Sequence, residues 1–276
     1  CLSTSLTAPM ASMLPVSGKV LFPALGAAGA SLLVLHLARR RRQKQLKGSA
    51  VGPVLCFGDS ITEGYFGVWP HPDFGPNNTG EDEMLNVRFH PYSIQLGARL
   101  AAADGIPSED IFYNIALKYA EVRAYSGWTA AEMLPRLKSL LFAGPWRACI
   151  ILAGSNDIVG DGESDEVALS RVAALHNACD AAGVPLIVVI NPDCDTTHHS
   201  AVPQEEKEPR RSALAGLAQK LMTKCLSEGR VVVDARKELP MDKDHCWLWD
   251  DSIHLSPAGS DKFGDIIFEA MQRHNL

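Results

Sequence analysis

From residue 51 onward, the chain alternates short runs of consecutive apolar residues with longer segments in which apolar positions recur every three or four residues. The short runs predict strands that are buried on both faces, and the longer segments predict helices with one apolar side. The expected strands are Val54–Phe57, Ile111–Ala116, Ala148–Ala153, Pro185–Ile190 and Val231–Asp234. The expected helices are Ser93–Ala103, Ala130–Leu141, Asp165–Ala182, Ser212–Ser227 and Pro257–Arg273.

This alternation predicts one doubly wound α/β domain, in which helices cover both faces of a five-stranded parallel sheet. Gly183 follows the third expected helix directly and is expected to cap its C-terminus. In such sheets, binding and catalytic residues gather at the carboxyl ends of the strands. The polar residues that follow each strand are therefore the first candidates for a functional site.

The first candidate is Ser60, which follows the first strand in the stretch Gly58–Gly64. A glycine before the serine permits a tight turn into the next helix. Free backbone N–H groups and the positive end of the helix dipole then favour an anion close to Ser60. This setting suits a nucleophile whose substrate develops an oxyanion. Simple capping of the helix by Asp59 and Ser60 is the alternative interpretation of the same residues.

Two further candidates are hydrogen-bond donors that follow the second and third strands. Gly127 can bring its backbone N–H close to a ligand because glycine has no side chain. Asn156, in the stretch Gly154–Asp157, can donate from its side chain to an oxyanion. An ordinary loop glycine and an Asx turn are the respective alternatives.

The last candidates are Asp251 and His254, on the segment that precedes the final helix. Aspartate and histidine three residues apart allow the carboxylate to hold one ring nitrogen, so that the other nitrogen can take a proton from a serine. The pairs Asp195–His198 and Asp242–His245 have the same spacing. The place of Asp251 and His254, beyond the last strand, favours them as the pair that acts on Ser60.

Taken together, these stretches resemble the four sequence blocks of the SGNH (GDSL) hydrolases. The matching residues are GDSIT at 58–62, Gly127, GSND at 154–157 and DSIH at 251–254, and the resemblance covers about residues 51–273. It implies a flavodoxin-like three-layer α/β/α sandwich with a five-stranded parallel sheet. The segment DSIHLSPAG is also similar to small esterases that hydrolyse acetate esters, which favours short or medium acyl groups.

The resemblance also implies a reaction and its residues. Ser60 would be the nucleophile, His254 the general base and Asp251 the group that orients His254, so that an ester is hydrolysed through an acyl-enzyme. The backbone N–H groups of Ser60 and Gly127 and the side chain of Asn156 would form the oxyanion hole. Asp59 and Asp157 are expected to be structural hydrogen-bonding groups beside the site. This chemistry requires no metal and no organic cofactor.

Charge is distributed very unevenly along the chain. The net charge of −6 argues against a general nucleic-acid binder, which needs a basic face. Seven of the 26 basic residues and none of the 32 acidic residues precede Asp59. The sequence therefore predicts a basic leader, residues 1–50, followed by an acidic hydrolase domain, residues 51–276.

Within the leader, residues 20–38 carry no charge and are followed by four arginines, Arg39–Arg42. Nineteen helical residues span about 28 Å, close to the thickness of a bilayer core. We therefore expect a single membrane span at 20–38, membrane association through 20–42 and, from the basic residues after the span, a cytosolic catalytic domain. A cleaved organellar transit peptide is the alternative, because the leader is acid-free and contains serine and arginine.

The remaining features are less specific. Seven cysteines without a CxxC pair indicate free thiols in a reducing compartment. Residues 192–211 contain several potential metal ligands, but their spacing is irregular, so a polar substrate-side loop is the preferred interpretation and no metal site is expected. Four tryptophans are expected either to line a cleft or to pack in the core: Trp69, Trp128, Trp247 and Trp249.

The sequence therefore favours a serine esterase or lipase that acts on a small-molecule or lipid ester. A carbohydrate O-acetyl esterase with the same triad is one alternative, and a non-catalytic membrane-tethered interaction module is another. The oligomeric state is left open.

Overall fold

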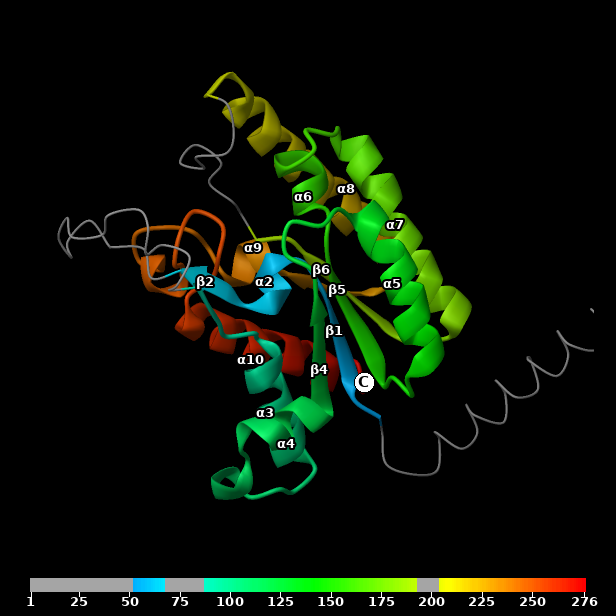
Figure 1. The fold of residues 1–276 in the computed structure, drawn as a ribbon, viewed down its shortest axis with the longest axis vertical. Helices are drawn as coiled ribbons and strands as arrows, with labels where there is room; N and C mark the ends of the chain where they lie inside the picture. Colours follow the sequence, from blue (N-terminus) through cyan, green and yellow to red (C-terminus); the bar gives the residue numbers. More distant parts are fainter. Residues whose placement is uncertain (1–51, 68–86, 193–203) are drawn as a thin grey trace, which may run out of the picture. The chain divides into compact units, whose positions relative to one another are not determined.

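The computed structural model describes residues 52–67, 87–192 and 204–276, all of which fall in one unit, Val51–Leu276 (Figure 1). The strands are β1 (Val54–Gly58), β2 (Tyr65–Gly67), β3 (Val87–Phe89), β4 (Ala120–Ala124), β5 (Ala148–Leu152), β6 (Leu186–Ile190) and β7 (Val231–Asp234). The longer helices are α3 (Ser93–Ala103), α4 (Tyr113–Tyr119), α5 (Ala130–Ala143), α7 (Asp165–Ala182), α8 (Lys207–Ser227) and α10 (Pro257–Arg273). The short helices are α2 (Ser60–Glu63), α6 (Ser155–Val159) and α9 (Ala235–Glu238), with 3-10 turns at Ser108–Asp110, Gln204–Glu206 and Cys246–Leu248.

Five parallel strands form the main sheet in the order β4-β1-β5-β6-β7. Counted along the chain within this sheet, the order is 2-1-3-4-5, the flavodoxin-like arrangement. The chain turns to one side of β1 to form β4 and to the other side to form β5. In such sheets, ligands bind where the strand order reverses, which here is beyond the carboxyl ends of β1 and β5.

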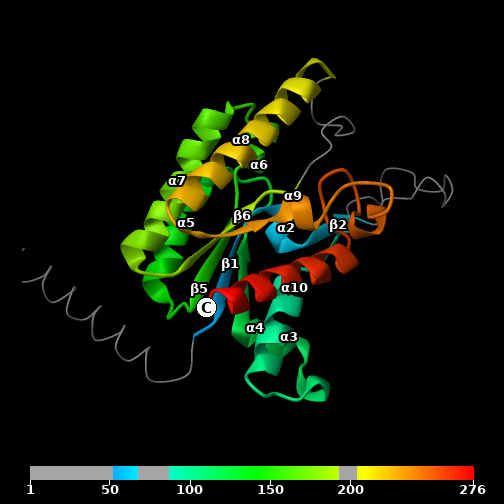
Figure 2. The same cartoon turned by 180° about the vertical axis from the view of Figure 1, so that it is seen from behind.

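Helices cover both faces of this sheet and produce three layers, as the two opposite views show (Figure 1, Figure 2). Alternate residues of β1 point to opposite faces, so each strand supplies both cores. Val54 and Cys56 belong to the core beneath α3 and α10, whereas Leu55 and Phe57 belong to the core beneath α5, α7 and α8. All five residues of β1 are buried, as the continuous apolar run predicts. The expected three-layer α/β/α sandwich is therefore confirmed.

The prediction of a second strand at Ile111–Ala116 is wrong. Residues Tyr113–Tyr119 form helix α4, and the strand that pairs with β1 is β4, Ala120–Ala124. The apolar stretch at 111–116 suggests a strand, but α3 offers Gly97 as a site of close approach to Ala116, and the two helices pack there. The true strand is less apolar because it lies at the edge of the sheet.

The other expected elements agree with the structure to within a few residues, except at the start of α8. This helix begins at Lys207, five residues before the expected Ser212. The added turn is strongly charged, and its Arg210 donates to the carbonyl of Val159. Gly183 caps α7 with a left-handed backbone, φ 67°, as expected. The hairpin of β2 and β3 and the short helices α6 and α9 were not expected, whereas the helix expected at Ser60 is present as the short helix α2.

The expected single-pass membrane location requires correction. Across residues 52–67, 87–192 and 204–276, no helix is both long enough and apolar enough to cross a membrane. The segment that was expected to span the membrane, residues 20–38, lies outside the described residues, as do the basic cluster and the rest of the leader.

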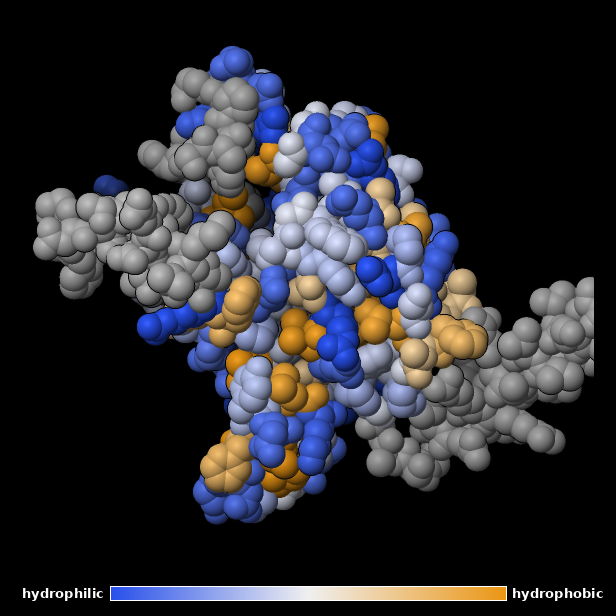
Figure 3. Space-filling view, in the orientation of Figure 1, coloured by the Kyte–Doolittle hydropathy of each residue, from blue (hydrophilic) through white to orange (hydrophobic). Residues whose placement is uncertain are grey.

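Hydrophobic residues on the surface occur among polar ones on the face shown in Figure 3. The large hydrophobic side chains that remain exposed in the described residues come from several elements, with two of them adjacent at the start of α4: Phe89, Phe112, Tyr113, Phe142, Val167, Leu226 and Trp247.

Candidate active site

The turn after β1 places Ser60 at the start of α2. Asp59 precedes the helix, and its Oδ1 accepts a hydrogen bond from the backbone N–H of Ile61 at 3.1 Å. Gly58 is required at the end of β1, because a Cβ there would overlap Thr62 and the carbonyl of Leu152. The result is a half-buried serine at the carboxyl end of a central strand.

Ser60, His254 and Asp251 form a continuous hydrogen-bonded series. The Nε2 of His254 lies 3.0 Å from the Oγ of Ser60, and its Nδ1 lies 2.7 Å from Oδ2 of Asp251. All three side chains are half-buried. The structure therefore brings the expected nucleophile, base and orienting carboxylate together in hydrogen-bond order.

Asp251 is fixed by the backbone of its own loop. Its Oδ1 accepts hydrogen bonds from the N–H groups of Ile253, at 2.7 Å, and His254, at 2.6 Å. Burial opposes the negative charge, but the hydrogen bond and charge of His254 and the two N–H groups hold the pKa of Asp251 below its usual value. The carboxylate is therefore ionised at neutral pH, and its orientation toward His254 is set locally.

A second Asp–His pair forms the same local contact without a serine. The Nδ1 of His245 lies 2.7 Å from Oδ1 of Asp242, and both side chains are exposed. The pair Asp195–His198 lies outside the described residues. The contact with Ser60 is therefore what distinguishes His254 from His245.

The loop between β4 and α5 carries Gly127, which is exposed and has a φ of 76°. A side chain would meet no neighbouring atom at this position, so the left-handed backbone is the reason for glycine here. The loop is tied to the nucleophile turn at two points. Tyr125 N donates to the carbonyl of Gly58 at 2.9 Å, and the hydroxyl of Ser126 donates to the carboxylate of Glu63 on α2.

Asn156 lies on the short helix α6, which starts at the carboxyl end of β5. Gly154 allows the turn into this helix with a φ of 106°. One N–H of the Asn156 side chain donates to the carbonyl of Trp128 at 3.1 Å. The side chain is thus held beside the loop that carries Gly127, and this bond uses one of the two N–H groups of the amide.

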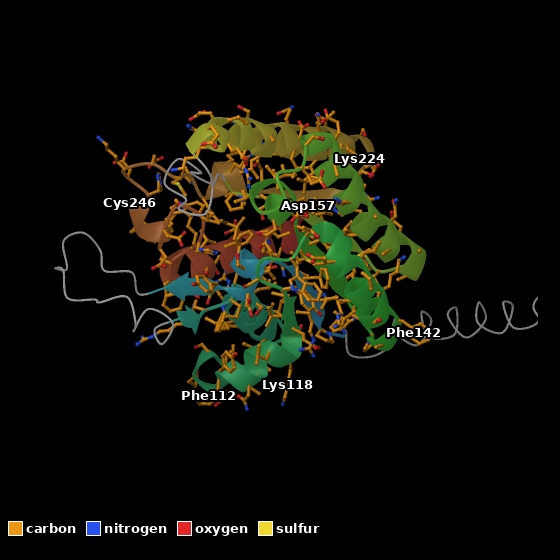
Figure 4. The ribbon with its side chains drawn as sticks, turned by 45° about the horizontal axis from the view of Figure 1, so that its top comes forward. Phe112, Lys118, Phe142, Asp157, Lys224 and Cys246 are labelled. Carbon is orange, nitrogen blue, oxygen red and sulfur yellow. The ribbon has the colours of Figure 1, made fainter. Side chains whose placement is uncertain are left out.

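Two buried aspartates link these turns to one another. Asp59 is 1% exposed, and its Oδ2 accepts a hydrogen bond of 2.6 Å from Ser155. Burial raises the pKa of Asp59, although the bonds from Ser155 and Ile61 partly offset this effect. Asp157 is fully buried and lies well inside the molecule (Figure 4). Its Oδ2 accepts a hydrogen bond from the backbone N–H of Ala130 at 2.9 Å.

Aromatic side chains lie against His254 and in the loop that carries Gly127. The ring of Tyr65 lies 4.7 Å from that of His254, and Tyr125 stacks on Trp128 at the same distance. Trp249 is buried and Trp247 is exposed, and Trp69 lies outside the described residues. Among the tryptophans that the structure describes, Trp128 is the one whose backbone carbonyl accepts a hydrogen bond from a candidate site residue, Asn156.

The described part of the chain contains no group of three or more His, Cys, Asp or Glu side chains that could hold a metal ion. The potential ligands at 193–203, including Asp193, Cys194, His198 and His199, lie outside it. The free thiols in the described part are at Cys56, Cys149, Cys179, Cys225 and Cys246.

Comparison with solved structures identifies the fold. A GDSL-like lipase from Bacteroides thetaiotaomicron superposes with a TM-score of 0.55 at 14% identity, covering 86% of this chain and 98% of that chain. A lipase/acylhydrolase from Enterococcus faecalis gives 0.54 at 20% identity, covering 82% and 97%. A member of the lipolytic G-D-S-L family from Veillonella parvula gives 0.54 at 12% identity, covering 80% and 98%. No curated protein matches the chain.

The family itself is identified by a sequence model. The model of the GDSL-like lipase/acylhydrolase family matches residues 56–262, which include the turn after β1 and the loop that carries His254. This match favours an ester hydrolase over the alternative of a non-catalytic interaction module. The chain belongs to the GDSL-like lipase/acylhydrolase family and is a hydrolase that acts on ester bonds.

Proposed function

We propose that this hydrolase is a serine esterase that cleaves small carboxylic esters through an acyl-enzyme on Ser60. The observation that carries the proposal is the series of hydrogen bonds from Ser60 Oγ through His254 to Asp251. A serine hydroxyl is a weak nucleophile, and a base within hydrogen-bond distance activates it.

In the acylation step, Ser60 Oγ attacks the carbonyl carbon of the ester while Nε2 of His254 takes the hydroxyl proton. The tetrahedral intermediate then loses the alcohol, to which His254 returns that proton. Asp251 keeps Nδ1 protonated and stabilises the imidazolium that forms in between. General-base assistance of this kind contributes about 10²–10⁴-fold to the rate.

The negative charge on the carbonyl oxygen would be bound by the backbone N–H groups of Ser60 and Gly127 and by the side chain of Asn156. Two observations support this assignment. Asn156 is held beside the Gly127 loop through Trp128, and that loop is joined to the nucleophile turn through Gly58 and Glu63. Donors that are fixed before the reaction stabilise the oxyanion at no further cost in reorganisation.

In the deacylation step, a water molecule attacks the acyl carbon and gives a proton to His254. The bond to Ser60 Oγ breaks, the carboxylic acid leaves and His254 returns the proton to the serine. Every proton is carried by His254, so these steps use groups that the chain itself provides.

Short or medium acyl groups are the proposed substrates. The ring of Tyr65 lies 4.7 Å from that of His254, and Tyr125 stacks on Trp128 in the loop that carries Gly127. We propose that these rings limit the length of the acyl group that fits beside Ser60. Residues 51–276 are the proposed hydrolase domain, because every residue given a role in this chemistry lies within it.

The proposal is tested with p-nitrophenyl esters of graded acyl length, from acetate to palmitate, and the purified chain. We expect turnover that is highest for short or medium esters and is abolished in Ser60→Ala. Equal turnover by Ser60→Ala would contradict the assignment of the nucleophile. A maximum at palmitate would contradict the acyl length alone.

A further inference from the structure

We infer that Arg171, on α7, is a positioning residue for the loop that carries Gly127, and that it acts through the buried carboxylate of Asp157. The inference rests on the proposed function, in which Gly127 and Asn156 bind the oxyanion. Arg171 does not belong to any of the four sequence blocks, and its side chain contacts Asp157 from a helix on the face of the sheet.

Asp157 joins α5 to α7 by its two carboxylate oxygens. Its Oδ2 accepts a hydrogen bond from the backbone N–H of Ala130 at 2.9 Å, and its Oδ1 accepts one from Nη1 of Arg171 at 3.1 Å. The carboxylate is completely buried, whereas the Arg171 side chain is 27% exposed. A buried carboxylate needs such compensation, because an unpaired charge in the interior is costly.

The bond to Ala130 fixes the start of α5, three residues after Gly127. Thr129 caps this helix in a capping box with Glu132, which fixes the direction in which the chain passes from the loop into α5. The residue before Asp157 completes the arrangement, because Asn156 donates to the carbonyl of Trp128. Two consecutive residues, 156 and 157, therefore hold the end of the loop that presents Gly127.

Arg171 also closes the turn that follows α6. Its Nη2 donates to Glu163 at 2.7 Å, and its Nη1 lies 3.6 Å from Asp161. The N–H of Glu163 in turn donates to the carbonyl of Asp157 at 2.9 Å. One guanidinium thus sets both the position of the Asp157 carboxylate and the conformation of the backbone around it.

Loss of the guanidinium would leave Asp157 buried with one partner fewer. The carboxylate would then be free to move, and its bond to Ala130 N would weaken. A displacement of about 1 Å at a catalytic group can cost about 10²-fold in rate. The effect should fall on kcat, because the oxyanion develops in the transition state and not in the bound ester.

The experiment compares Arg171→Gln and Arg171→Lys with the wild-type chain. For Arg171→Gln we expect kcat on p-nitrophenyl acetate to fall about 10- to 100-fold, with KM changed by less than about threefold. Arg171→Lys keeps the charge and should recover part of kcat. Amide hydrogen exchange in the peptide that covers residues 125–131 should become faster in Arg171→Gln.

Arg230→Gln is the matched control. Arg230 also binds two carboxylates, Asp180 on α7 and Glu228, and its side chain is 14% exposed. The substitution of Arg230 removes a similar set of ion pairs, near the C-terminal end of α7. We expect a lower melting temperature, kcat within about twofold of wild type and unchanged exchange in 125–131.

Two results would overturn the inference. One is an Arg171→Gln chain with wild-type exchange in 125–131, and the other is an equal fall of kcat in Arg230→Gln. Failure of the proposed function has a different signature, namely wild-type turnover by Ser60→Ala. The exchange measurement still decides in that case whether Arg171 holds the loop.

Discussion

The Nε2 of His254 lies 3.0 Å from the Oγ of Ser60, although 194 residues separate them in the chain. The parallel sheet accounts for this contact, because Ser60 follows β1 and His254 lies on a loop at the same edge, between the last strand and α10. The contact of His254 with Asp251 is set by their spacing in the sequence, whereas its contact with Ser60 is set by the fold.

His254→Ala should lower kcat for ester hydrolysis by about 10²–10⁴-fold, because Ser60 loses its general base. His245→Ala is the matched control, since His245 makes the same 2.7 Å contact with Asp242 but lacks the serine. Its kcat should stay within about twofold of wild type. Steady-state kinetics on p-nitrophenyl acetate measures both variants. A large loss of kcat confined to His245→Ala would assign the general base to His245 instead.

Asn156→Ala tests the side-chain donor of the oxyanion hole. We expect kcat to fall about 10²–10³-fold, as for the loss of one such donor, with little change in KM. The bond to the carbonyl of Trp128 is lost as well, so the melting temperature should be measured in parallel. A rise in KM at constant kcat would assign Asn156 to substrate binding instead.

Much of the fold could be predicted because the central strands are buried on both faces. The apolar runs of β1, β5, β6 and β7 identify them, and the order of elements then predicts a parallel sheet. Edge strand β4 was missed because Glu121 and Arg123 interrupt its apolar pattern, while the β-prone stretch before it forms α4. Packing of α3 against α4 decides this case, and packing is not visible in local sequence.

The residues of the candidate site also depend on packing that local sequence does not show. The spacing of Asp251 and His254 occurs three times in the chain, so the choice among the pairs depends on where the fold places each one. Arg171 has no sequence signal at all, because a lone arginine on an amphipathic helix is ordinarily a solvent-exposed residue. Its contact with Asp157, 14 residues earlier, depends on how α7 packs beside α6.

The packing of α3 against α4 gives a prediction on stability. Gly→Ala inside a helix usually stabilises a protein by up to about 1 kcal/mol. At Gly97 the added Cβ would overlap the carbonyl oxygen of Ala116, a backbone atom that cannot move without displacing α4. We therefore expect Gly97→Ala to lower the free energy of unfolding by about 1–3 kcal/mol.

Gly216→Ala provides the comparison for Gly97→Ala. A Cβ at Gly216 on α8 would approach the carboxylate of Asp165 equally closely, but that atom is the end of a side chain that can rotate away. Its effect on the free energy of unfolding should be smaller than that of Gly97→Ala. Urea denaturation of both variants measures the difference, and equal losses would contradict the role assigned to backbone packing.

His176 on α7 should make the protein sensitive to acid. The side chain is 1% exposed, and neither ring nitrogen has a hydrogen-bond partner among the residues that the structure describes. Burial lowers the pKa of His176 to about 4, and the nearby charges of Arg230, Glu228, Asp180 and Lys224 modify this effect. The folded protein therefore keeps His176 neutral at a pH where the unfolded chain is already protonated.

Between about pH 6.5 and pH 4 the unfolded chain binds more protons than the folded one at His176, so the free energy of unfolding falls as the pH falls. A lowering of this size corresponds to about 3 kcal/mol over the whole window. His176→Leu should remove this part of the pH dependence in urea denaturation, whereas His245→Ala, at an exposed histidine, should keep it. If the free energy of unfolding changed with pH in the same way in wild type and His176→Leu, another group would be the cause of the acid sensitivity.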